Sequence, residues 1–183
     1  MTFILISDLD GTILGQHDFD FGLIKSDIIN LLDSGHLLVL ASSKTKVEIE
    51  SFCDELGRSV PFIYENGAGF QNAKTIISES FSESNIRSQF AMDKEDIWDI
   101  WCEQIPKDLK VLCLFAHDMT ERQQIDLFGL TGQKLENALA REYSFCFKFL
   151  GNRLQLKHLK YLLNKHQLIA HQGGRLTTLS GKH

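Results

Sequence analysis

Hydrophobic residues in the first third of the chain form short continuous runs that alternate with helical stripes. Residues 3–6, 37–40 and 62–64 are apolar and prone to β structure, the pattern of strands buried on both faces of a parallel sheet. Between them, apolar residues recur at helical spacing over 24–32 and 49–56. This order predicts a βαβαβ unit with right-handed crossovers, in which ligands bind beyond the carboxyl ends of the strands.

The pattern changes at about Gly69, where we expect a second unit of mixed α and β structure. Thr120-x-x-Gln123 has the form of a capping box, and Phe145, Phe147 and Phe149 alternate as a half-exposed strand would. The predicted elements are strands at 75–77 and 111–116, a helix over 97–105 capped by Asp93 and stopped by Pro106, helices opening at 120 and around 135–139, the strand at 145–149, a helix over 156–163, and strands on either side of Gly173-Gly174.

The predicted fold class is therefore α/β, a doubly wound parallel (Rossmann-like) core with an inserted α+β cap. We expect the core in residues 1–68, the cap in residues 69–179 and the start of the return to the core in residues 180–183.

Composition limits the functions to consider. The chain has 183 residues, of which 43% are hydrophobic and 23% charged, so it can bury a core. Its net charge of −5 and scattered Lys and Arg form no basic stripe, which disfavours nucleic-acid and membrane-surface partners and favours a small molecule. The apolar start is too short for a secretory core and no apolar run approaches the length of a membrane span, so the cytoplasm is expected. The four cysteines and seven histidines are spaced unlike metal ligands or a disulfide framework.

Two carboxylates, Asp8 and Asp10, follow directly after the first predicted strand, and Gly11 permits a turn there. Such a pair suits metal-assisted displacement at phosphorus. Asp8 would be the nucleophile and a metal ligand, and Asp10 would be the general acid and base. Mg²⁺ is the expected cofactor because it favours hard oxygen ligands. The alternative is a strand terminator or a calcium loop, which the buried strand before the pair disfavours.

The motif Asp8-x-Asp10-Gly11-Thr12 resembles the first motif of the haloacid dehalogenase superfamily. The resemblance implies that the Asp10 carbonyl is a further magnesium ligand. It also implies that Ser42, which ends the next strand, donates its hydroxyl to a phosphate oxygen; taken alone, such a serine can equally cap the next helix.

Further segments resemble the mannosyl-3-phosphoglycerate phosphatase family and occur in the family's order. They are Ser42-Ser43-Lys44-Thr45 with Glu48, Glu65-Asn66-Gly67, Met119 to Arg122, Gly129 to Thr131, Arg141 to Ser144, and Gly173-Gly174-Arg175. Lys44 would supply positive charge, Asn66 an amide beside the phosphate and Arg175 a partner for the substrate carboxylate. Their alternative interpretations are a solvated helix-start residue, a turn former and a surface arginine of a hairpin.

The sequence departs from this family at two places. Phe145 and Cys146 stand where the family usually has Glu and Pro, which changes the expected sugar specificity. The superfamily's third-motif Lys and fourth-motif acidic pair follow the cap, and the chain ends at Lys182-His183 before they would appear. We expect this truncation to leave the core incomplete at its C-terminal side, to cost roughly 10⁴ in rate, and to leave residues 3–6 as an apolar sheet edge open to self-association.

Three functions follow as hypotheses. The first is magnesium-dependent hydrolysis of a glycosyl phosphoglycerate through an aspartyl-phosphate on Asp8. The second is a catalytically impaired remnant that binds a phosphorylated ligand, or a partner protein through its sheet edge. The third keeps the chemistry but acts on another phosphorylated small molecule, such as a sugar phosphate.

Overall fold

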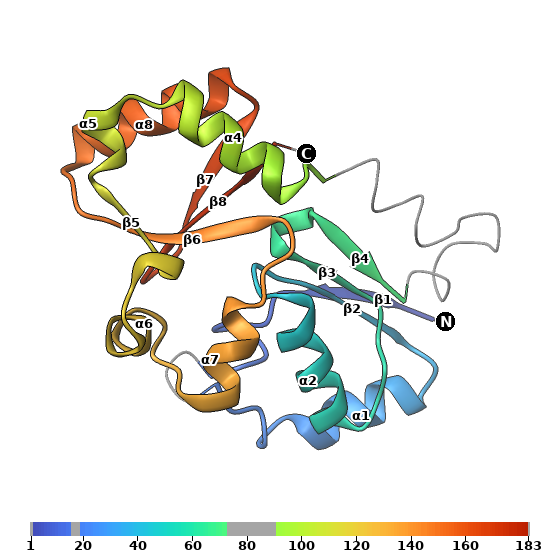
Figure 1. The fold of residues 1–183 in the computed structure, drawn as a ribbon. Helices are drawn as coiled ribbons and strands as arrows, with labels where there is room; N and C mark the ends of the chain where they lie inside the picture. Colours follow the sequence, from blue (N-terminus) through green and yellow to red (C-terminus); the bar gives the residue numbers. More distant parts are fainter. Residues whose placement is uncertain (1, 16–18, 73–90, 183) are drawn as a thin grey trace. The chain divides into compact units, whose positions relative to one another are not determined.

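The computed structural model describes residues 2–15, 19–72 and 91–182 (Figure 1). The chain divides into two compact units, Met1–Phe90 and Ala91–His183. The predicted boundary at 68/69 thus differs from this division by the stretch 69–90, and the predicted strand at 75–77 lies outside the described residues. Each unit has its own sheet.

The first unit contains a sheet with strand order β1-β2-β3-β4. Strands β1 (Ile4–Ser7), β2 (Leu37–Ala41) and β3 (Phe62–Tyr64) run parallel, joined by α1 (Lys25–Asp33) and α2 (Lys46–Leu56). The predicted α/β class with a parallel, Rossmann-like sheet is confirmed. Both helices lie on the same side of this sheet in Figure 1, as successive right-handed crossovers require.

A fourth strand, β4 (Gly69–Gln71), pairs antiparallel with β3. We expected these three residues in the cap, because a segment of this length is too short to show the two-residue alternation of a strand. A short 3₁₀ turn, Glu65–Gly67, joins the two strands. Gly69 packs against the ring of buried Tyr64 so closely that a Cβ at this position would lie 2.1 Å from the ring. The pairing therefore depends on glycine here.

The first strand, β1, is the edge of this sheet, as predicted. The expectation that it is buried on both faces is wrong. Phe3, Ile4, Leu5 and Ile6 are 52%, 56%, 41% and 70% exposed. A strand with one neighbour, next to a helix α1 whose residues all keep some solvent exposure, has too little around it to cover its side chains.

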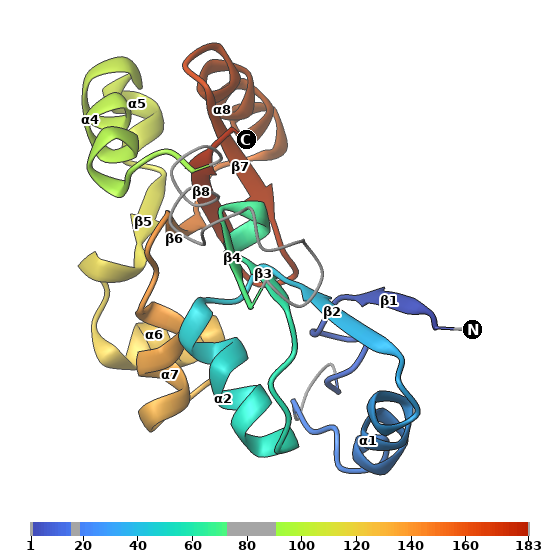
Figure 2. The same ribbon diagram turned by 90° about the vertical axis from the view of Figure 1, so that its right-hand side faces the viewer.

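The second unit contains an antiparallel sheet with strand order β5-β6-β8-β7. Its elements are α4 (Lys94–Gln104), α5 (Lys107–Lys110), β5 (Cys113–Phe115), the 3₁₀ turn η3 (Ala116–Asp118), α6 (Glu121–Phe128), α7 (Gly132–Leu139), β6 (Ser144–Phe149), α8 (Arg153–Lys165), β7 (Leu168–Gln172) and β8 (Thr177–Gly181). Figure 2 shows α4, α5 and α8 gathered at one end of this unit and α6 and α7 at the other.

Alternation along β6 separates two hydrophobic clusters. Phe147 belongs to the cluster with Trp101 and Leu159, whereas its neighbour Cys146 belongs to the cluster with Leu127 and Leu135. Successive side chains of a strand point to opposite faces, so this sheet is covered on both. The helix stripes, the strands around Gly173-Gly174 and the capping box of Thr120 with Gln123 are confirmed. Asp93 occupies the N-cap position of α4 but makes no side-chain cap bond.

The four cysteines are free thiols with different surroundings. Cys102 is exposed, whereas Cys53, Cys113 and Cys146 are buried. Burial raises the pKa of Cys113 to about 12 and also raises that of Cys53. Among the described residues, no helix is long and apolar enough to cross a membrane.

Candidate active site

The loop after β1 is held by the carbonyl of Leu9. This oxygen accepts the backbone N–H groups of Thr12, Ile13 and Leu14 at 3.2, 3.1 and 2.8 Å, and Gly11 takes a left-handed φ of +74° to complete the turn. Leu9 is fully buried while Asp8 and Asp10 are exposed. The buried residue thus anchors the loop, and the two carboxylates on either side of it face solvent.

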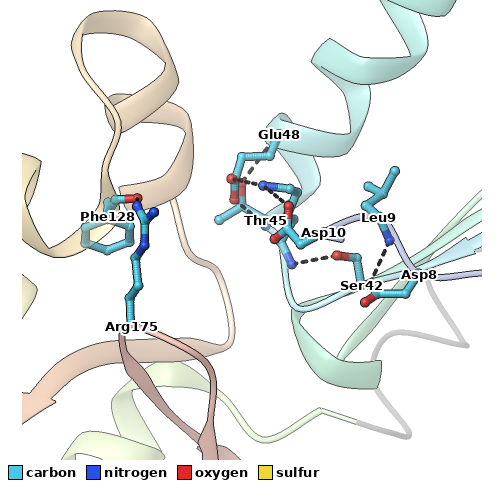
Figure 3. A network of polar contacts seen from close by, with 9 residues as sticks. Asp8, Leu9, Asp10, Ser42, Thr45, Glu48, Phe128 and Arg175 are labelled. Atoms are coloured by element: carbon cyan, nitrogen blue, oxygen red, sulfur yellow. Dashed lines mark hydrogen bonds and ion pairs between the residues drawn. The ribbon is translucent and has the colours of Figure 1, made fainter. Parts of the chain in front are cut away.

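The Asp8 side chain is oriented by the backbone of the residue that follows it. Its Oδ1 accepts a hydrogen bond from the N–H of Leu9 at 2.8 Å (Figure 3). A carboxylate has acceptor directions for about four such bonds, so this contact fixes its orientation and keeps capacity for a ligand.

The end of β2 places Ser42 and Lys44 in the same unit. Ser42 is buried, and its Oγ accepts the backbone N–H of Lys44 at 3.3 Å. Because a hydroxyl both accepts and donates, its hydrogen can still be given to another group. The Lys44 ammonium lies 3.1 Å from Asp10 Oδ1 and 3.1 Å from Glu48 Oε1.

The charge of Lys44 is kept by its neighbours. Burial lowers the pKa of Lys44, but the carboxylates of Glu48 and Asp10 outweigh that effect and raise it above its ordinary value. The face of the Phe19 ring also lies 5.1 Å from the ammonium. A fixed positive charge therefore stands beside Asp10 at neutral pH.

Asn66 lies on the turn after β3, which is tied to the loop after β2. Its backbone N–H donates to the Ser42 carbonyl at 3.2 Å, and that of Glu65 to the Lys44 carbonyl at 2.9 Å. Glu65 and Asn66 both have positive φ, a conformation that is strained in residues other than glycine and is typical of functional sites. Asn66 Nδ2 is buried and has no hydrogen-bond partner among the residues that the structure describes.

Arg175 belongs to the second unit. Its Nη1 donates to the Phe128 carbonyl at 3.4 Å (Figure 3). The guanidinium lies where a side chain at Gly129 would be: a Cβ there would be 1.9 Å from Nη1, and Gly129 has a φ of +69°. Gly129 therefore makes room for this side chain at the end of α6.

The donor chemistry of the first unit fits a magnesium ion. Asp8 and Asp10 are hard oxygen donors, and Mg²⁺ is commonly bound through one or two carboxylates together with water and phosphate. Within the described residues, no group of three or more His, Cys, Asp or Glu could hold a metal. An ion here would accordingly take its other ligands from water, the backbone or a substrate.

The profile of the haloacid dehalogenase-like hydrolases matches residues 5–170, which include the site residues of the first unit and end before Arg175. The chain belongs to that family. A glucosyl-3-phosphoglycerate/mannosyl-3-phosphoglycerate phosphatase from Persephonella marina is 29% identical over 98% of this chain and 66% of its own length. A phosphatase of the same name from Methanococcoides burtonii is 34% identical over 67 residues, 37% of this chain and 25% of its own length. The chain thus spans slightly less than two thirds of the length of the Persephonella marina phosphatase.

Solved structures agree with the fold of this haloacid dehalogenase-like hydrolase. One is a haloacid dehalogenase-like hydrolase from B. subtilis, with a TM-score of 0.63 and 15% identity, covering 100% of this chain and 74% of the other. The sucrose-phosphatase from Synechocystis sp. has a TM-score of 0.51 and 12% identity, covering 98% of this chain and 64% of the other.

Of the predicted site residues in this haloacid dehalogenase-like hydrolase, the first unit links four by ion pairs or hydrogen bonds. They are Asp10, Ser42, Lys44 and Asn66, and Asp8 lies two residues from Asp10. Glu48 entered the expectations only through the family resemblance, and its contact with Lys44 was not predicted. The signal that finds it is Thr45-x-x-Glu48, a capping box that places an acid beside the preceding lysine.

Proposed function

We propose that this chain carries the nucleophile and the acid–base residue of a magnesium-dependent phosphatase that hydrolyses a phosphate monoester. The observation that carries the proposal is the pair Asp8 and Asp10 on a loop anchored by Leu9, with the Lys44 ammonium 3.1 Å from Asp10. The family match over residues 5–170 supports it independently.

In the proposed first step, a carboxylate oxygen of Asp8 attacks phosphorus and the bond between phosphorus and the ester oxygen breaks. The protonated Asp10 gives its proton to the departing alkoxide, which leaves as an alcohol. The product on the protein is an aspartyl-phosphate. Ser42 would donate a hydrogen bond to a phosphate oxygen, and the Asn66 amide would do the same.

In the second step, Asp10, now ionised, takes a proton from a water molecule that attacks phosphorus. The bond between phosphorus and the Asp8 oxygen breaks, which regenerates the carboxylate and releases inorganic phosphate. A magnesium ion held by the Asp8 carboxylate and the Asp10 carbonyl would supply positive charge that stabilises the phosphoryl oxygens, which leaves the Asp10 side chain free for proton transfer.

The substrate class we favour is a glycosyl phosphoglycerate, mannosyl-3-phosphoglycerate or its glucosyl analogue. Support comes from the names of the two relatives and from the family segments that extend through the second unit. Arg175 is the proposed partner of the substrate carboxylate, since a guanidinium matches that group with two hydrogen bonds.

A panel of phosphate esters tests this function. We expect magnesium-dependent phosphate release to be fastest with the mannosyl and glucosyl phosphoglycerates, slower with simple sugar phosphates, and reduced at least about 10²-fold by EDTA, because the phosphoryl charge then lacks its main counter-charge. The measurement is inorganic phosphate over time, with restoration by added Mg²⁺ as the control. Release that is unaffected by EDTA would contradict the metal assignment. If another ester were hydrolysed fastest, that ester would define the substrate class instead.

A second candidate function is association through the exposed edge strand β1. Four consecutive apolar residues are between 41% and 70% exposed there, and an unpaired edge invites pairing with another chain. We propose that two copies of this chain pair through β1.

Sedimentation velocity over a range of concentrations tests the pairing. We expect wild type to associate and Ile6→Lys to weaken association by about 10-fold or more, because a lysine on an edge strand opposes strand addition. Leu154→Lys is the matched control, since it adds the same charge at a side chain of similar exposure on α8, 78% against 70%. Monomeric wild type at every concentration would rule the pairing out.

A further inference from the structure

The start of α2 uses Glu48 for two purposes. The Thr45 hydroxyl accepts the N–H of Glu48 at 3.2 Å, and Glu48 Oε2 accepts the N–H of Thr45 at 2.9 Å, which closes a capping box. The other carboxylate oxygen, Oε1, lies 3.1 Å from the Lys44 ammonium. One carboxylate thus joins the helix terminus to the cation beside Asp10.

Helix capping alone does not explain why the third position of α2 is the charged residue Glu48. Among the described residues, two other helices begin with a capping box, α6 at Thr120 and α8 at Asn152, and both use glutamine at the third position. Gln123 and Gln155 make the reciprocal bond through a neutral amide oxygen. Of these capping boxes, the one of α2 uses glutamate, and the carboxylate of this glutamate also contacts Lys44.

Lys44 is held between two carboxylates that differ in exposure. The side chains of Lys44 and Glu48 are 11% and 10% exposed, whereas that of Asp10 is 41% exposed. Glu48 is also bonded to the helix terminus through Thr45 N–H, whereas Asp10 is the more exposed partner. A lysine has several rotatable bonds, and a second fixed partner restricts the positions its ammonium can take.

We propose that Glu48 is a positioning residue for Asp10: it holds the Lys44 ammonium at one place, and that ammonium orients the carboxylate that transfers the proton. This inference rests on the proposed phosphatase function. Without the charge of Glu48, Lys44 follows Asp10 alone and the carboxylate loses its fixed direction. Substrate binding through Ser42 and Asn66 does not depend on this contact.

Glu48→Gln tests the inference because glutamine keeps the capping box and removes the charge. We expect kcat to fall about 10-fold and KM to change less than about twofold, since small misplacements of a catalytic group lower the rate of chemistry. Tm should fall only modestly, because Lys44 keeps Asp10 as a partner and the capping box is retained. Glu50→Gln is the matched control: it removes the same charge from the same helix, where Glu50 pairs with Lys46 at 3.8 Å. We expect Glu50→Gln to keep the wild-type kcat.

A second measurement needs no turnover. A buried, doubly paired ammonium exchanges its hydrogens slowly, so ¹H–¹⁵N spectra of the lysine ammonium groups should show a Lys44 signal, assigned by its loss in Lys44→Arg. We expect Glu48→Gln to speed this exchange and Glu50→Gln to leave it unchanged. If no ester is hydrolysed by wild type, the phosphatase proposal fails on its own, and this signal still decides whether Glu48 holds Lys44. Unchanged exchange in Glu48→Gln, an unchanged kcat in an active enzyme, or an equal fall in kcat in Glu50→Gln would each overturn the inference.

Discussion

Replacing Asp8 with asparagine is expected to lower phosphate release by about 10⁴-fold or more, since removal of a covalent nucleophile has effects of this size. A neutral amide oxygen is a poor nucleophile toward phosphorus. Asparagine has the same shape as aspartate, so its amide oxygen can still accept the hydrogen bond from the Leu9 N–H that Asp8 accepts at 2.8 Å. We therefore expect the loop and the unfolding temperature to be preserved. The measurement is the initial rate with the best ester of the panel.

Acid quenching followed by mass measurement gives an independent readout of Asp8. Wild type mixed with substrate should carry one phosphoryl group, and Asp8→Asn should carry none. The control is Asp33→Asn, which makes the same change at an exposed aspartate of the first unit that pairs with Arg58 at 3.2 Å. Asp33→Asn should resemble wild type in both measurements. Persistent turnover or phosphorylation in Asp8→Asn would assign the nucleophile to another residue.

Asp10→Asn should separate the two chemical steps. With an alkyl phosphate we expect a loss of about 10²- to 10⁴-fold, the usual contribution of a general acid or base, because the alkoxide then leaves without a proton. An aryl phosphate has a better leaving group and depends less on the acid, so Asp8 should still be phosphorylated. Hydrolysis of that intermediate needs the base, and the phosphorylated chain should therefore accumulate.

The Asp10→Asn experiment measures the burst of phenolate that is released before steady turnover begins. Rapid mixing with an aryl phosphate should release about one phenolate per Asp10→Asn chain, followed by slow turnover, and the quenched protein should carry the phosphoryl group. Asp33→Asn again serves as the comparison. Equal losses with alkyl and aryl esters, with no accumulated intermediate, would show that Asp10 does not act in both steps.

The sequence predicted the first unit well because its signals are local. A continuous apolar run gives β2, a helical stripe gives α2, and a turn signal gives the bend at Asn66. Parallel strands connected by helices bring their carboxyl ends to one edge, so Asp8, Ser42 and Asn66 could be grouped before any coordinates were known.

Features that depend on partners far along the chain could not be predicted in this way. The three residues of β4 become a strand only by pairing with β3, and the exposure of β1 depends on what lies next to it. The contact of Arg175 with the Phe128 carbonyl joins residues 47 positions apart. The ion pair of Lys44 with Asp10 likewise depends on how the loops after β1 and β2 meet, which local sequence does not give.

The thiols described above offer a built-in probe of stability. The first unit contains the buried Cys53 and the second contains the buried Cys113, whose raised pKa further slows its reaction with alkylating reagents. Exposed Cys102 reacts first and can carry a label on the native protein. Alkylation at Cys53 and Cys113 then requires opening of the surrounding core, so peptide mapping over time measures the opening of each unit separately, without engineered cysteines.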